Sequence, residues 1–147
     1  MHNMPKNEKM KIFSTMLVCI SLCGCTSLQV SSVNLQSTSI KQICIEENLN
    51  SIVDDLPGVM VRFVQKQGIQ TMVFSGQLPA ACQYHMKYEA FQGRDGVNFL
   101  AKFSVQLIKD KQIIAMGAYD VGSGLSLAKW GSTASKVEPI LEKMLVK

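Results

Sequence analysis

The stretch CQYHMKYEA, residues 82–90, has the clearest periodicity in the chain. Apolar or aromatic side chains alternate with polar ones, which is the period of a β-strand that packs one face on a core and keeps the other in water. Residues 99–107 alternate in the same way, and the turn-forming sequence QGRDG, residues 92–96, separates the two segments. Residues 112–121 follow a tight reversal at Asp110-Lys111. We therefore predict a meander of three antiparallel strands.

The segments before and after this meander predict the remaining elements. Residues 40–45 and 69–74 are apolar and rich in β-branched side chains, as strands are. Between them, apolar residues from Leu49 to Val64 recur at helical spacing, with a kink or break expected at Pro57-Gly58. A last helix is predicted after a cap at Ser132 or Thr133. The order β-α-β-β-β-β-α indicates an α+β two-layer sandwich, a mostly antiparallel sheet with two helices on one face.

The N-terminal segment has the organisation of a secretory signal. Residues 1–11 are polar and include three lysines, and residues 12–22 form an apolar run. That run is too short to span a bilayer, which needs about 20 residues, but it has the length of a signal peptide. Met10 is an alternative start that would leave a shorter signal of the same kind.

Leu22-Cys23-Gly24-Cys25 resembles the bacterial lipobox. The resemblance implies diacylation of the Cys25 sulfur, cleavage after Gly24 and acylation of the new N-terminus. Residues 1–24 would then be a lipoprotein signal peptide. Thr26, rather than Asp, follows the cysteine, which in enterobacterial-type sorting implies the outer membrane, with the protein lipid-anchored on its periplasmic face. The alternatives are a plain signal peptide cut elsewhere, or a buried core helix.

Residues 25–38 are rich in Ser, Thr, Asn and Gln and lack sustained periodicity. We predict that they form a flexible tether and that residues 39–147 form a single α+β domain.

Cys44 and Cys82 are the thiols that remain beyond the lipidation site. The periplasm is oxidising, so such pairs tend to close. A bridge between them would stabilise the folded state by about 4 kcal/mol, by the chain-entropy relation for the loop that it closes. Two separate buried thiols are the alternative, because sequence does not give the distance between the two Cα atoms.

No residue pattern in the chain is typical of catalysis. His85 lies among polar residues, without a nucleophile or orienting acid at a useful spacing. We predict no catalytic residues, no metal site and no cofactor. The net charge of +4 is not concentrated in a basic cluster, which argues against a nucleic-acid partner.

Aromatic residues with polar groups are the remaining site candidates. A partner or ligand surface is predicted at Tyr84, Tyr88, Tyr119, Lys129 and Trp130. The alternative is that these residues pack between sheet and helix.

The pattern Cys82-x-Tyr84-x-x-x-Tyr88-x-Ala90, followed by Ala118-Tyr119 and Leu127-x-Lys129-Trp130, resembles small proteobacterial lipoproteins with no assigned activity. The similarity runs from about Ser39 to the C-terminus. One departure is Gly93-Arg94-Asp95, where the group has an aromatic residue before the Asp. The resemblance brings no catalytic residues. An anchored, compact domain without a catalytic constellation predicts a binding or assembly accessory of the cell envelope, with an envelope protein as partner. The alternative function is an enzymatic or small-ligand-binding lipoprotein with a pocket near Tyr84, Tyr88 and Trp130.

Overall fold

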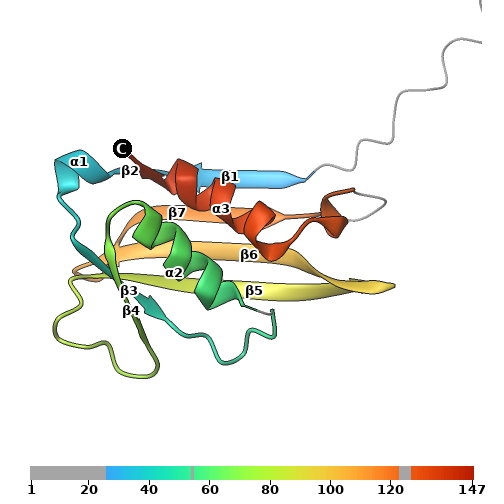
Figure 1. Cartoon of the computed structure of the whole chain (residues 1–147), viewed down its shortest axis with the longest axis horizontal. Coiled ribbons are helices and arrows are strands. Elements are labelled where there is room, and N and C mark those ends of the chain that lie inside the picture. Colours follow the sequence, from blue (N-terminus) through green and yellow to red (C-terminus); the bar gives the residue numbers. More distant parts are fainter. Residues whose placement is uncertain (1–25, 54, 123–126) are drawn as a thin grey trace, which may run out of the picture.

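The structure, a computed structural model, describes residues 26–53, 55–122 and 127–147. A six-stranded sheet has the order β1-β7-β6-β5-β3-β4, and helices α2 and α3 cover one of its faces (Figure 1). This confirms the predicted α+β two-layer class. The elements are β1 (Ser27–Ser31), β2 (Val33–Asn34), α1 (Leu35–Thr38), β3 (Gln42–Glu46), α2 (Leu56–Lys66), β4 (Gln70–Phe74), β5 (Tyr84–Asp95), β6 (Val97–Lys109), β7 (Gln112–Asp120), the 3-10 helix η1 (Leu127–Trp130), α3 (Thr133–Met144) and β8 (Leu145–Val146).

The predicted meander is present as β5, β6 and β7, and its first two strands are longer than predicted. β5 and β6 stay paired up to Asp95 and Val97, so the turn between them consists of Gly96 alone and is shorter than the predicted turn of residues 92–96. Gly96 has φ +73°. At the other end of β6, Asp110 and Lys111 both have positive φ, as in the two-residue turns that suit the twist of a hairpin. β3 runs parallel to both β4 and β5.

Helix α2 begins later than the apolar spacing predicted. Leu49 and Ile52 are 79% and 71% exposed and lie before the helix, which begins at Leu56 with Pro57 in its first turn. Proline lacks an N–H and has a fixed φ, so it suits the first turn, where backbone N–H groups have no helical partner. The expected interruption is therefore the beginning of the helix.

The prediction of a flexible tether over residues 25–38 is wrong for the residues that the structure describes. β1 pairs antiparallel with β7 from Ser27 opposite Asp120 to Ser31 opposite Met116. Without β1, β7 would be an open sheet edge, and a strand with few large apolar residues is suited to that position. α1 follows, with the Asn34 side chain accepting a hydrogen bond from the Ser37 N–H at 2.8 Å.

The core lies between the sheet and the two helices. Tyr84, Met86 and Tyr88 are buried there and Lys87 and Glu89 are exposed, which confirms the alternation of residues 84–90. The fully buried side chains of the core include Ile43, Ile45, Leu56, Met60, Val64, Phe103, Leu107, Ile140, Leu141 and Met144.

Cys82 departs from the predicted alternation. It precedes β5 and belongs with Cys44 and Phe74 to a small buried cluster separate from the main core. Cys44 and Cys82 form a disulfide, with their Cα atoms 5.8 Å apart. Of the two alternatives that the sequence left open, the structure contains the bridge. Cys82 cannot share the face of Tyr84 because it is bonded to Cys44, whose neighbours Ile43 and Ile45 supply the main core.

Tyr88 fastens the segment between β3 and α2 to the sheet. Its hydroxyl accepts a hydrogen bond from the Asn48 N–H at 3.2 Å, and the Asn48 side-chain amide donates to the Tyr88 carbonyl at 3.0 Å. Burial raises the pKa of Tyr88.

Removing this hydroxyl should weaken the fold modestly. Tyr88→Phe is expected to lower the free energy of unfolding by about 1 kcal/mol, because a partly buried N–H loses its partner. Urea titration followed by circular dichroism would measure the change. Tyr84→Phe, on the same face of β5 but outside this hydrogen-bonded pair, is the matched control. An equal loss in both variants would contradict the role given to Asn48.

Candidate functional site

The residues predicted to form one surface do not lie together. Tyr84, Tyr88 and Tyr119 are buried at 6%, 5% and 8% exposure, whereas Trp130 is 66% exposed. Tyr84 begins β5, and Trp130 lies beside the far end of that strand, since the neighbouring Lys129 pairs with Asp95. At about 3.3 Å per residue, this strand spans roughly 35 Å. The expected pocket lined by Tyr84, Tyr88 and Trp130 is therefore wrong, because the core face of β5 places both tyrosines under the helices.

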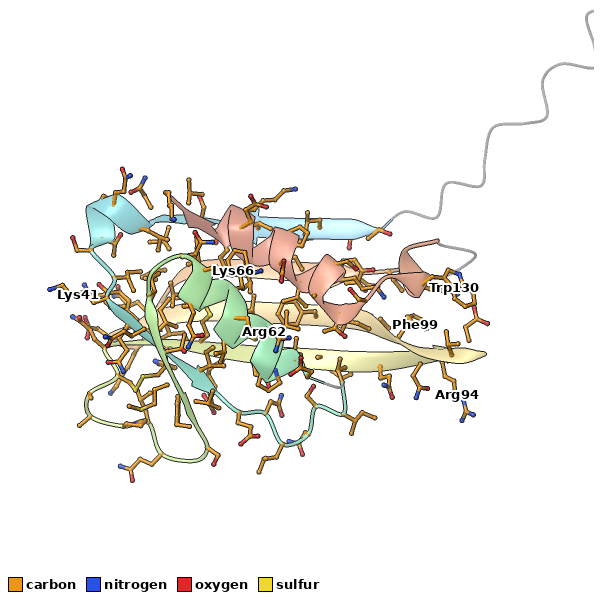
Figure 2. All side chains as sticks on the ribbon, viewed as in Figure 1. Lys41, Arg62, Lys66, Arg94, Phe99 and Trp130 are labelled. Atoms are coloured by element: carbon orange, nitrogen blue, oxygen red, sulfur yellow. A yellow bond between two sulfur atoms is a disulfide. The ribbon has the colours of Figure 1, made fainter. Side chains whose placement is uncertain are left out.

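A different group of residues meets around the tip of the β5–β6 hairpin. We call residues 94–99, Lys129, Trp130 and Lys136 the hairpin end. The Lys129 Nζ lies 2.9 Å from the Asp95 Oδ2. The Nζ atoms of Lys129 and Lys136 lie 5.6 Å and 5.5 Å from the centroid of the Phe99 ring, within cation–π range. Figure 2 shows Trp130, Phe99 and Arg94 at the same end of the molecule.

Gly93 makes room for the aromatic ring of this cluster. Gly93 pairs with Phe99 across the hairpin, and a Cβ at residue 93 would collide with the Phe99 ring. The ring can therefore lie across the backbone of β5. From the sequence Gly93 belonged to the predicted turn, and only the extension of β5 to Asp95 places it opposite Phe99.

Lys136 connects η1, α3 and β6. Only 7% of this residue is exposed, and its Nζ donates to the carbonyl of Leu100 at 3.3 Å and of Lys129 at 3.2 Å. Burial lowers its pKa. The two carbonyls and the Phe99 ring partly replace the lost water. They fix η1, and with it the exposed Trp130, against the sheet.

The sheet face opposite the helices carries a shallow groove of about 250 Å³ between β1, β5, β6 and β7. The Lys102 Nζ pairs there with the Asp120 Oδ2 at 3.1 Å. Two hydrogen bonds to its carboxylate lower the pKa of Asp120. The one from the Gly122 N–H has the larger effect, and the one from Lys102 the smaller. The exposed ring of Phe91 borders the groove.

His85 lies on this same open face, half-buried. Desolvation is the main cause that lowers the pKa of His85. The charge of Glu46 acts to raise this pKa, and the charge of Lys87 lowers it further. Within the described ranges, no three His, Cys, Asp or Glu side chains are placed to hold a metal ion. In the same ranges, no helix is long and apolar enough to cross a membrane. Cys25 and the predicted signal peptide lie outside the described residues.

Comparison with known proteins identifies the fold alone. No family model matches the chain, and no curated protein matches it. The PelC dodecamer from Paraburkholderia phytofirmans has a similar structure, with a TM-score of 0.51 and 12% identity over 83% of this chain and all of that one. A point variant of the same dodecamer, in a second crystal form, gives a TM-score of 0.46 at 12% identity, over 82% of this chain and 98% of that one.

Proposed function

We propose that this protein is a lipoprotein of the cell envelope, attached through Cys25 to the periplasmic face of the outer membrane, where it serves as a binding or assembly accessory rather than a catalyst. The observation that carries the proposal is the sequence Leu22-Cys23-Gly24-Cys25, which resembles a lipobox. The structure adds that β1 begins at Ser27, two residues after Cys25. With Thr26 alone between the lipidated residue and the sheet, the domain sits directly on the bilayer.

β1 begins on the same side of the molecule as η1 and the residues of the hairpin end (Figure 1). In the proposed orientation Trp130 and Arg94 face the lipid. Tryptophan is favoured at the level of lipid headgroups, and arginine can bury its aliphatic stem while its charge stays with the phosphates. The exposed side chain of Val97, at the tip of the hairpin, adds apolar area to the same end. The lipid supplies the anchor, since multiple acyl chains hold a protein firmly, and these residues set its orientation.

The fold shared with PelC supports the accessory role. That protein was solved as a dodecamer, and we propose that this chain likewise acts through association with other protein chains.

Lipidation is tested by feeding labelled palmitate to bacteria that express the full chain. Label is expected in the wild type and in Cys23→Ala, and it is expected to be lost in Cys25→Ala. Cys23 is the matched control because it is a neighbouring cysteine in the same signal. Equal labelling of the Cys25→Ala variant, or no labelling of the wild type, would overturn the proposal.

Orientation is tested with the single tryptophan of the chain, Trp130. When the purified lipoprotein is placed in phospholipid vesicles, its emission is expected to shift to the blue and to be quenched by brominated lipids, because the indole enters the headgroup region. The control is Trp130→Phe combined with Ile113→Trp. Ile113 is 53% exposed and pairs with Ile108 near the other end of β6, roughly 35 Å from the tip of the β5–β6 hairpin. Equal quenching of the two proteins would exclude the proposed orientation.

A further inference from the structure

A second groove, of about 300 Å³, lies on the helix side of the sheet between β1 and α3. Thr26 and Leu28 form one wall, Tyr119 of β7 forms the floor, and the other wall belongs to α3, with Pro139 and Ile140. Leu28 is 41% exposed, so an apolar side chain stands open to solvent at the rim. The volume of the groove is at the lower limit for sites that hold small molecules.

The charged residue of this groove does not direct its charge into it. The Lys136 Nζ is bound to the carbonyls of Leu100 and Lys129 and lies near the Phe99 ring. Lys136 therefore offers the groove its aliphatic stem. An apolar occupant fits such a lining better than an anion does.

Tyr119 supplies a polar atom without a partner. Its side chain is more than nine-tenths buried, and its hydroxyl makes no hydrogen bond within the described residues. Burial raises its pKa, so the hydroxyl stays protonated and can donate. A buried hydroxyl that lacks a partner costs about 1–3 kcal/mol, so an occupant that brings a hydrogen-bond acceptor is favoured.

The position of the groove points to one occupant. Thr26 lines the groove and directly follows Cys25, and consecutive Cα atoms are about 3.8 Å apart. We infer that the groove receives the glycerol-ester end of the lipid carried by Cys25, with an ester carbonyl accepting a hydrogen bond from the Tyr119 hydroxyl. This inference rests on the proposed lipidation. An acyl methylene gains about 0.8 kcal/mol whether it is buried in protein or in a bilayer, so the hydrogen bond, not the chain length, favours the groove.

The test uses the full chain produced in bacteria fed a fatty acid that carries a photoreactive diazirine near its carboxyl end. After purification and irradiation, mass spectrometry of the digested protein is expected to find the anchor crosslinked to peptides of β1 and α3. Leu28→Gln should reduce this crosslinking about fivefold, because a polar side chain replaces part of the apolar wall. Val146→Gln is the matched control, since Val146 is equally exposed at 41% and lies in β8, which does not line the groove.

A second readout concerns the hydroxyl itself. The infrared band of the anchor's ester carbonyl, labelled with ¹³C, is expected to lie at lower frequency in the wild type than in Tyr119→Phe. Labelled anchor without crosslinks to β1 or α3, or equal crosslinking in both glutamine variants, would overturn the inference and leave the lipoprotein proposal standing. The same holds for an ester band that Tyr119→Phe leaves unchanged. Failure of Cys25 to incorporate any labelled lipid would overturn both.

Discussion

Gly117→Val is expected to lower the free energy of unfolding by about 3 kcal/mol or more. Gly117 lies on the helix face of β7, between β1 and β6, where it pairs with Val30 and Val105. A Cβ at this position would collide with the Cγ2 of Ile140, which is fully buried in α3. The collision involves a packed core side chain, so either α3 must move off the sheet or β7 must bend. Overpacking of this kind typically costs about 1–3 kcal/mol, and a valine adds two methyl groups beyond the Cβ.

Urea or guanidinium unfolding followed by circular dichroism would measure this loss. Against a typical stability of about 5–15 kcal/mol, it is large enough to reduce the yield of folded protein. Ala118→Val is the matched control, because residue 118 is next in the strand and points to the open face, where it lines the groove of about 250 Å³. An unchanged unfolding midpoint in Gly117→Val would show that α3 does not pack closely on β7.

Removal of the disulfide has an expected effect of similar size. The Cys44→Ala/Cys82→Ala variant should lose about 4 kcal/mol, because residues 38 apart in sequence are no longer joined in the unfolded chain. Alanine leaves an apolar group at both buried positions beside Phe74, so most of the loss is that of the covalent link. The segment of residues 75–83 contains no helix or strand and returns the chain from β4 to β5. It should be the first part to open, which hydrogen exchange would detect.

Reductant supplies the internal control for this variant. Wild-type protein unfolded in the presence of dithiothreitol should approach the midpoint of the double variant, and the variant itself should not respond to reductant. If the wild type were equally stable with and without reductant, the bridge would contribute nothing to stability. The expected difference in melting temperature is about 15 °C, at roughly 4 °C per kcal/mol for a domain of this size.

The elements with strong local patterns were predictable from the sequence. Alternation in residues 84–90 and 99–107 identified the central strands, because the side-chain period of a strand is a local property. Asp110-Lys111 was correctly assigned as a turn, and Ser132 does cap α3, its side chain accepting from the Ser135 N–H at 3.1 Å. These features depend on a few neighbouring residues, and for that reason the fold class could be predicted.

The candidate site was much less predictable. The sequence selected Trp130 and Lys129, but it grouped them with Tyr84, which lies roughly 35 Å away along β5, and with Tyr88 and Tyr119, which are buried. Phe99, Arg94 and Lys136 were missed because their association depends on the length of the β5–β6 hairpin. That hairpin brings Asp95 to Lys129 across 34 residues of sequence.

The sequence by itself determined the alternating strands, the helix cap and the lipobox-like segment, since each is written in adjacent residues. Only the tertiary structure decided that residues 27–31 are an edge strand, that Cys44 meets Cys82, and that Trp130 lies at the end of the sheet where the chain emerges from the proposed anchor. The physical reason is that polar residues such as those of β1 have no strong preference of their own. Their conformation is set by the unpaired backbone groups of β7, a partner about 90 residues away in the chain.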